Sequence, residues 1–263
     1  MKYSAAHKEL QKVFDFPSNG FADCSIDRFE DYKRIVSGPA YNDFMPRTIS
    51  GLKKENINSA LDWLAEKLYS YFKSADTDFE AWHKNTCLAF CEKINLCNVR
   101  IHYGKAQKIV NMSFKYLFCL NDSQNYAAKF RGCHMALDKY TLEWFIRFVL
   151  TKEKHKHISV TKIRETSWSK LTCGSSEEEY TYLWFQSEIK KYLNSEKNIY
   201  ITEGGEPLGS LLAEFYIWPE MQLHLAMEAL YSRGGNDKDF KDKSIPDKIG
   251  ELRTFLDKLE VSV

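Results

Sequence analysis

The chain of 263 residues has little of what β-rich and membrane-spanning proteins need. It contains 12 Gly and 6 Pro, too few for the many turns of an all-β fold. No apolar run approaches the ~18 residues that a transmembrane helix requires. The opening residues, from Met1 to Ser4, lack the pattern of a signal peptide. We therefore expect a soluble protein without a membrane segment, built mainly from helices.

The sequence also lacks a large net charge of either sign. Its 37 Lys and Arg residues are balanced by 36 Asp and Glu residues, so the strong excess typical of a dedicated nucleic-acid binder is absent. The charge is nevertheless uneven. Residues 98–131 hold six Lys or Arg residues and one Asp, and residues 151–170 hold six Lys or Arg residues and two Glu residues. These segments fit either a basic face or ordinary solvated helix surfaces.

Seven cysteines are an odd number, and without a signal peptide they favour free thiols in a reducing cytoplasm. His83, Cys87 and Cys91 recur at every fourth residue and so project from one helix face, with Cys97 a few residues later. Zinc sites use these residue types, but the chain has no Cys-x-x-Cys knuckle. We interpret the group as thiols buried in a helix interface and predict neither a metal site nor a cofactor.

Amphipathic segments follow one another along the chain with short polar breaks. Apolar residues at spacings of four, three, four and four predict a helix over residues 56–73: Ile57, Leu61, Leu64, Leu68 and Phe72. A capping box at Thr77-Asp78-Phe79-Glu80 predicts a second helix that runs to about Leu96. The same reasoning predicts further helices over residues 4–14, 26–36, 104–121, 138–152, 176–195, 208–217, 220–232 and 246–260.

These segments predict an all-α fold, a compact multi-helix globular domain over residues 1–263. Residues 152–170 are the longest stretch without helical periodicity, and their polar, basic character suits a surface loop. If the domain has two helical lobes, we expect their boundary near residues 152–172. Residues 198–202 alternate weakly, but a lone strand has no partner, so we expect an extended loop there.

The most informative region is the apolar segment over residues 102–117. Gly104 opens it, and Lys108, Asn111 and Lys115 form a polar stripe along an otherwise hydrophobic helix. Because a helix this apolar is mostly buried, its lysines must either extend to the surface or occupy a pocket where desolvation lowers their pKa. A lysine of the second kind is an amine nucleophile. Thirty residues after Lys108, Asp138 begins another predicted helix, where an Asp ordinarily acts as the N-cap.

This pair of segments resembles the helix-hairpin-helix DNA glycosylase superfamily, in particular its archaeal 8-oxoguanine glycosylase branch. In that family a nucleophilic lysine opens an apolar helix of the form Lys-x-x-Val-x-x-x-Lys-Met. An apolar-x-Val-Asp segment about thirty residues later supplies a catalytic Asp. Here Lys108 and Lys115 keep the lysine spacing, and Met135-Ala136-Leu137-Asp138 matches the second segment. The resemblance covers about residues 100–145, roughly a sixth of the chain.

The chain departs from the family pattern at several positions. Val110 comes one residue early, Tyr116 replaces the Met and Leu137 replaces the Val. Only Gly104 stands where most members have a Gly-x-Gly hairpin, which puts the capture of a DNA phosphate by backbone N–H groups in doubt. No iron-sulfur spacing of cysteines follows.

The resemblance implies two helical lobes with a cleft, and an enzyme that excises a flipped and possibly oxidised purine. Lys108 would attack the sugar C1′ and form a Schiff base that permits strand scission by β-elimination. Asp138 would stabilise the positive charge on the sugar and assist proton transfers. Lys105, one turn away, is the second candidate for the nucleophile. Contacts to double-stranded DNA would come from residues of the basic segment: Lys105, Gly104, Lys115 and Arg131.

A flipped base also needs an apolar or aromatic pocket. Trp144, Trp168 and Trp218 are candidates for it because they lie near the relevant segments, although a core position suits each of them better. Glu206 and Glu214 flank a turn that contains a proline. Either carboxylate could line a pocket, but an exposed turn and a helix surface are their expected settings.

A second hypothesis comes from a different class of protein. In a non-catalytic, all-α protein-interaction module, Lys108 and Asp138 would form a buried ion pair and the aromatic surface would bind a protein partner. An enzyme predicts a cleft that holds both side chains, with the basic segments at its rim, whereas an interaction module predicts that both are packed shut. A nuclease would need clustered carboxylates for Mg²⁺, and the consecutive residues 177–179 cannot all face one site on a helix.

Overall fold

The structure is a computed structural model that describes residues 21, 23–75, 78–151, 153–201 and 205–232. Helices dominate this part of the chain, and its β pairing is limited to one bridge between Ile201 and Pro207. The expected all-α class is therefore confirmed, as is the extended loop near residue 200. None of the described helices is long and apolar enough to cross a membrane. The helices expected over residues 4–14 and 246–260 lie outside the described residues.

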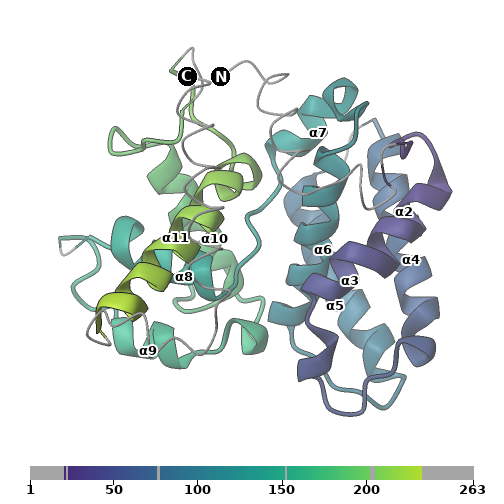
Figure 1. Ribbon diagram of the computed structural model, residues 1–263, viewed down its shortest axis with the longest axis horizontal. Coiled ribbons are helices and arrows are strands. Elements are labelled where there is room, and N and C mark those ends of the chain that lie inside the picture. Colours follow the sequence, from purple (N-terminus) through teal and green to yellow (C-terminus); the bar gives the residue numbers. More distant parts are fainter. Residues whose placement is uncertain (1–20, 22, 76–77, 152, 202–204, 233–263) are drawn as a thin grey trace.

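The first half of the described chain forms one group of helices, and the second half forms another beside it (Figure 1). The first group comprises α2 (Phe29–Ile35), η1 (Val36–Ala40), α3 (Tyr41–Asp43), η2 (Pro46–Thr48), α4 (Lys54–Lys73), α5 (Phe79–Asn95), α6 (Tyr103–Phe118), η3 (Ser123–Tyr126) and α7 (Ala127–Arg131). The second comprises α8 (Lys139–Trp144), η4 (Phe145–Val149), α9 (Val160–Glu165), η5 (Trp168–Lys170), α10 (Tyr182–Leu193) and α11 (Ser210–Ser232).

The chain passes from the first group to the second through residues 132–138. The boundary that we expected near residues 152–172 falls inside the second half, where α9 and η5 stand. The helical turn η5 packs back against α6 of the first group. The two groups are thus tied together at more than one place along the chain.

The α4 helix follows the sequence closely, because its five-residue apolar stripe is the face that it buries. At the next helix Thr77, the first residue of the expected capping box, lies outside the described residues. Asp78 is the N-cap residue of α5, and its Oδ1 accepts a hydrogen bond of 3.1 Å from the backbone N–H of Glu80. The Glu80 carboxylate instead contacts His134, far along the chain.

Two helices in the second half have bounds that differ from the expected ones. The α10 helix begins at Tyr182 rather than residue 176, because the positive φ of Tyr180 is incompatible with a helix. The two helices expected on either side of Pro219 are one helix, α11. Phe215 and Met221 are buried before and after the proline, so packing outweighs the lost backbone hydrogen bond.

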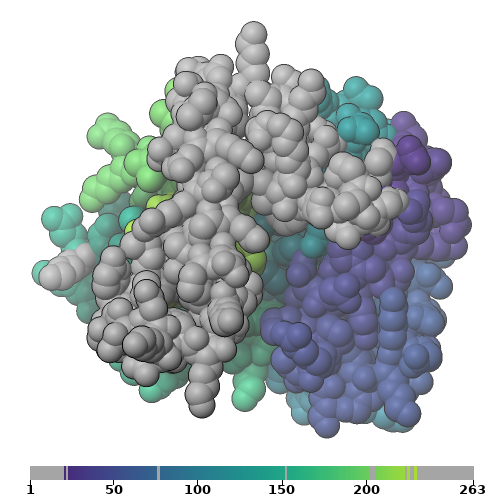
Figure 2. Space-filling view, viewed as in Figure 1, coloured from purple at the N-terminus to yellow at the C-terminus, as the bar shows by residue number. Residues whose placement is uncertain are grey.

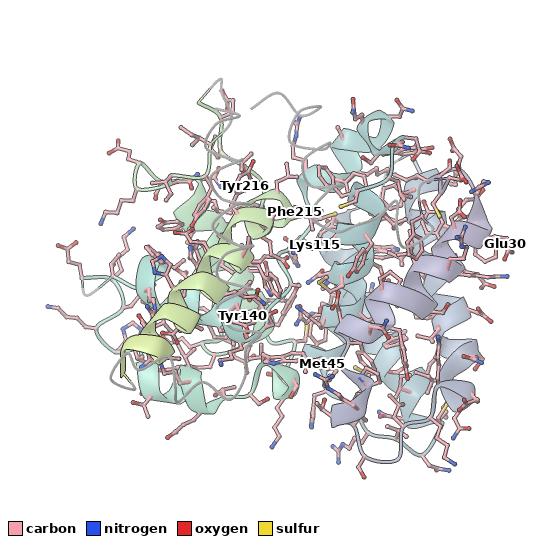
Figure 3. All side chains as sticks on the ribbon, in the orientation of Figure 1. Glu30, Met45, Lys115, Tyr140, Phe215 and Tyr216 are labelled. Atoms are coloured by element: carbon pink, nitrogen blue, oxygen red, sulfur yellow. The ribbon has the colours of Figure 1, made fainter. Side chains whose placement is uncertain are left out.

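The α6 helix lies at the centre of the molecule, next to the boundary between the two groups (Figure 1). Lys115 on this helix points toward Phe215 of α11, whereas Glu30 lies at the outer edge (Figure 3). In the same view, the N-terminal helices, coloured purple to blue, form the surface on the right, and green and teal segments lie on the left (Figure 2). A central helix in this position can present side chains to both groups.

Candidate functional site

The three lysines of α6 are all buried, as the apolar character of the helix predicted. Lys105 and Lys108 are each 6% exposed, and Lys115 is 3% exposed. Burying an ammonium group is costly unless hydrogen bonds or opposite charges compensate for it. The partner of each lysine therefore indicates what that lysine can do.

Asp138 is the N-cap residue of α8, as its position in the sequence predicted. Its Oδ1 accepts hydrogen bonds from the backbone N–H groups of Tyr140 (2.8 Å) and Thr141 (3.1 Å). The Thr141 hydroxyl accepts one in return from the N–H of Asp138 (2.8 Å), which completes a capping box. One carboxylate oxygen is thus fixed by the helix, and the other remains for side chains.

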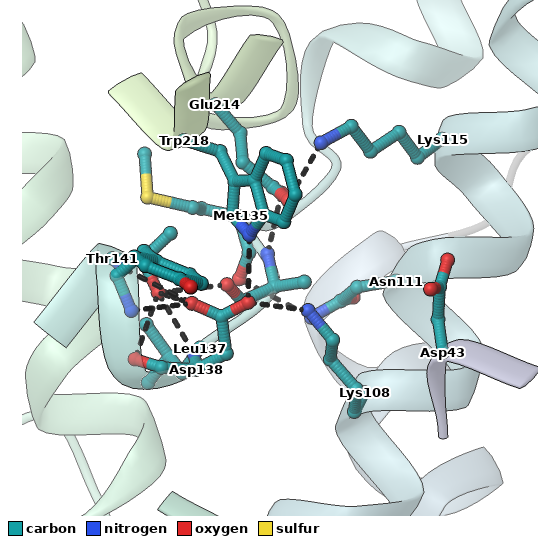
Figure 4. A network of polar contacts seen from close by, with 12 residues as sticks. Asp43, Lys108, Asn111, Lys115, Met135, Leu137, Asp138, Thr141, Glu214 and Trp218 are labelled. Atoms are coloured by element: carbon teal, nitrogen blue, oxygen red, sulfur yellow. Dashed lines mark hydrogen bonds and ion pairs between the residues drawn. The ribbon is translucent and has the colours of Figure 1, made fainter. Parts of the chain in front are cut away.

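The second carboxylate oxygen of Asp138 accepts a hydrogen bond from Lys108, across the boundary between the two groups of helices (Figure 4). Nζ of Lys108 lies 2.8 Å from Asp138 Oδ2, and the indole Nε1 of Trp218 donates to the same oxygen at 3.0 Å. The Lys108 side chain is 7% exposed and that of Asp138 is 12% exposed. The two residues singled out from the sequence therefore form one buried ion pair.

Each partner of this pair strengthens the charge of the other. Burial lowers the pKa of Lys108, but the nearby carboxylates of Asp138 and Glu214 outweigh it, so the pKa lies above its usual value. Burial likewise raises the pKa of Asp138, yet the Lys108 ammonium and the hydrogen bonds to the carboxylate outweigh it, so the pKa lies below its usual value. The resting pair is an ammonium and a carboxylate.

Side-chain amides form hydrogen bonds with the backbone of the extended segment that precedes Asp138, as the backbone of a neighbouring β-strand would. The Gln107 amide donates to the Leu137 carbonyl at 2.8 Å and accepts from the Leu137 N–H at 3.1 Å. Asn111 and Gln186 both donate to the Met135 carbonyl. Because these backbone groups are all satisfied, Asp138 is held in one position relative to α6.

A second buried ion pair lies further along α6. Nζ of Lys115 is 3.0 Å from Oε1 of Glu214, and the other carboxylate oxygen accepts the backbone N–H of Ala136 at 2.7 Å. Our expectation that Glu214 occupies a helix surface was wrong, because its side chain is fully buried. The reason is tertiary, since α11 turns this face toward Lys115. The lysine also lies 4.9 Å from the centre of the Phe215 ring.

Lys105, the second candidate nucleophile, has a different environment. Its ammonium donates to the carbonyls of Phe44 and Met45 (3.0 and 3.4 Å) and to the Thr48 hydroxyl (2.7 Å). It also lies 4.7 Å from the centre of a Trp168 ring. Burial, with a smaller contribution from the charge of Lys108, lowers the pKa of Lys105 to about 8. This lysine therefore secures the turn after α3.

The remaining residues expected at a DNA interface lie in different settings. Gly104 is packed so tightly that a Cβ atom would fall 1.9 Å from the Trp168 carbonyl oxygen, and its N–H donates to the Leu171 carbonyl at 3.0 Å. That N–H is engaged within the chain. Arg131 is exposed at the end of α7 and lines a separate groove.

The three tryptophans are divided among different roles. Trp144 is fully buried, and its indole donates to the Tyr200 hydroxyl at 3.2 Å, as a core position requires. Trp168 covers Lys105, and Trp218 contacts Asp138. One aromatic residue therefore belongs to the ion pair.

His83 and Cys87 are part of a buried polar network, whereas Cys91 and Cys97 are only partly buried. His83 Nε2 lies 2.9 Å from Asn111 Oδ1, and the ring stacks on Tyr182 at 5.4 Å. Burial, followed by the charge of His134, lowers the pKa of His83, so the ring is neutral. Among the described residues no cluster of His, Cys, Asp or Glu is arranged to hold a metal ion.

Sequence reasoning missed Gln107 as a residue that orders the site. A signal was present, because Gln107 and Asn111 are four residues apart on a helix that is otherwise apolar. Amides on such a face must find buried partners.

Comparison of the chain with protein-family models, with curated proteins and with solved structures found no match.

Proposed function

We propose that the chain is a DNA base-excision glycosylase and lyase that acts on a flipped purine, with an oxidised purine as the first candidate, through Lys108 and Asp138. The observation that carries this proposal is the 2.8 Å contact between the two side chains, which lie thirty residues apart in the sequence. The resemblance pairs the same two positions. Support also comes from Trp218, which adds an aromatic surface and an N–H donor at the same carboxylate.

The pair can generate a nucleophile without outside help. Lys108 rests as an ammonium and must lose a proton before it can attack. Transfer of that proton from Nζ to Asp138 Oδ2 converts two buried charges into a neutral amine and a neutral acid. Closing the site around a substrate favours this change, because desolvation penalises both charged forms.

The covalent step then follows from the same two groups. The amine forms a bond to C1′ of the flipped nucleotide while the bond from C1′ to the base breaks. The leaving base takes the electron pair and receives the proton held by Asp138. Opening of the sugar ring gives a protonated Schiff base on Lys108, from which β-elimination cleaves the strand.

The packing around the pair favours a second candidate function, the non-catalytic interaction module. Both side chains are nearly closed off from solvent. A groove of about 1130 Å³ elsewhere in the molecule is lined by neither of them. A glycosylase with this site requires a local opening that admits the flipped nucleotide while Lys108 and Asp138 stay in contact, whereas an interaction module requires no opening.

Borohydride trapping distinguishes the two functions. The full chain is incubated with duplexes that carry oxidised or normal purines, and the Schiff base is reduced to a stable adduct. We expect an adduct with the wild type and with Lys139→Gln, an exposed control at the start of α8. We expect none with Lys108→Gln, and a strong reduction with Asp138→Asn.

Two outcomes would count against the proposal. Equal trapping by Lys108→Gln would exclude that lysine as the nucleophile. If no lesion gives an adduct, and a base-release assay also detects no excised base, the glycosylase function is excluded and the interaction module stands.

A further inference from the structure

A groove of about 1130 Å³ lies between α5, α7, α10 and the start of α11, and neither Lys108 nor Asp138 lines it. Its volume is that of a site for a small organic ligand. Part of the lining is apolar, with contributions from Phe130, Leu183 and Leu212. The groove is therefore a second candidate site, independent of the proposed glycosylase function.

Three cations from three different helices line this groove. They are Lys84 of α5, Arg131 of α7 and Lys190 of α10. Within the described part of the chain none of the three has an ion-pair partner. Two acids, Glu80 and Glu206, also line the groove, so its charged residues carry a net charge of one positive unit. The charge of Lys190 also acts on the Glu80 carboxylate, but no ion pair joins any of the three cations to a described residue. Cations around a concave surface favour an anionic ligand.

Gln186 in the lining supplies a second, independent observation. Its side-chain amide donates to the Met135 carbonyl at 2.7 Å, which fixes the orientation of the amide group. The other end, Oε1, is buried and has no hydrogen-bond partner among the described residues. The residue is only 4% exposed. Because this oxygen is closed off from solvent, a ligand N–H donor reaches it only when the amide turns toward the groove, and that contact would relieve the cost of an unsatisfied buried acceptor.

The start of α11 borders the same groove through Gly209 and Ser210. A helix of 23 residues presents free N–H groups and a partial positive charge at its N-terminus. A Cβ atom at Gly209 would lie 3.0 Å from the Arg131 carbonyl oxygen, so α7 ends close to the place where α11 begins. The helix start therefore adds anion-binding groups beside one of the cations.

We propose that this groove binds a phosphorylated small molecule of nucleotide size, a nucleoside monophosphate. The phosphate contacts Lys84, Arg131, Lys190 and the N-terminus of α11. The flat base packs on the apolar lining and donates an N–H to Gln186 Oε1. A DNA backbone offers phosphate as well, but as a diester without the second ionisable oxygen, so the two sources can be separated by experiment.

The test is isothermal titration of the full chain with inorganic phosphate and with the monophosphates of adenosine, guanosine, cytidine and uridine. We expect at least one monophosphate to bind, and Lys190→Gln and Arg131→Gln each to weaken its affinity about tenfold. Lys197→Gln, which removes an exposed cation outside the groove, serves as the matched control and should change the affinity less than about twofold.

Gln186→Leu separates the base contact from the phosphate contact. It should weaken the monophosphate about fivefold or more while leaving inorganic phosphate within about twofold. If this variant fails to fold, as judged by circular dichroism, the two surface variants still decide the question. The proposal is overturned if no monophosphate binds at millimolar concentration. It is also overturned if Lys197→Gln acts like Lys190→Gln, or if an oligonucleotide without terminal phosphates competes equally well.

Discussion

Lys105 and Lys108 lie one turn apart on the same buried helix, yet the structure gives them opposite electrostatic environments. The ammonium of Lys105 is surrounded by carbonyl and hydroxyl oxygens, and burial lowers its pKa to about 8. The ammonium of Lys108 contacts a carboxylate, and its pKa lies above the usual value. Neutral oxygens do not compensate for the desolvation of a cation as a full negative charge does.

The difference shows that a low pKa alone does not identify a nucleophile. Lys105 loses its proton more easily, but its hydrogen bonds tie it to the turn after α3. Lys108 keeps its proton more firmly, but Asp138 is placed to accept it. We therefore assign the chemistry to Lys108 and a structural role to Lys105, and the following experiments test that division.

The largest effect is expected when the carboxylate of the pair is removed. Asp138→Ala leaves the Lys108 ammonium buried without its counter-charge and removes the N-cap of α8. The free energy of unfolding, measured in urea, should fall by about 3–5 kcal/mol. The double variant Asp138→Ala, Lys108→Met should recover part of that loss, because no charge is then left unpaired. A fall below about 1 kcal/mol for the single variant would mean that the pair is open to water.

A smaller effect is expected at the other lysine. Lys105→Met keeps the packing against Trp168 and removes hydrogen bonds to neutral oxygens, two of which are only partly buried. Removing a poorly compensated buried charge offsets the loss of these hydrogen bonds, so the free energy of unfolding at pH 7 should change by less than about 1 kcal/mol. A loss as large as that of Asp138→Ala would remove the distinction between the two lysines.

A third test of the comparison is the dependence of stability on pH. The pKa of Lys105 falls from 10.5 to about 8 on folding, so between these values the unfolded chain binds more protons. The contribution of Lys105 to stability therefore rises as the pH rises from about 8 to 10.5. Lys108 acts in the opposite direction, but only above 10.5, where its stabilising charge begins to be lost. Relative to Lys105→Met, the wild type should gain stability between pH 7.5 and 10. A flat difference would show that Lys105 is solvated.

Much of the helical scaffold was predictable from the sequence, because local patterns determine it. The apolar stripe of α4 and the capping role of Asp138 follow from residues within a few positions of each other. Helix bounds were less predictable where tertiary packing overrides a local signal. Pro219 lies inside α11 because the helix buries apolar residues on both sides of it.

The candidate site was predictable only in part. The sequence indicated that Lys108 is buried and that Asp138 begins a helix, but the resemblance was needed to pair them. Glu214 could not be placed, because its partner Lys115 lies 99 residues away and helix periodicity does not record such contacts. Gly104 looked like a phosphate-binding residue, and only the fold reveals that Leu171 occupies its N–H.

The most direct test of the account is to identify which amine reacts. The wild-type chain is trapped with borohydride on an oligonucleotide that contains oxidised guanine, then digested, and the modified peptide is sequenced by mass spectrometry. The account predicts that the adduct is on Nζ of Lys108. An adduct on Lys105 or on the N-terminal amine, with Lys108 unmodified, would contradict it.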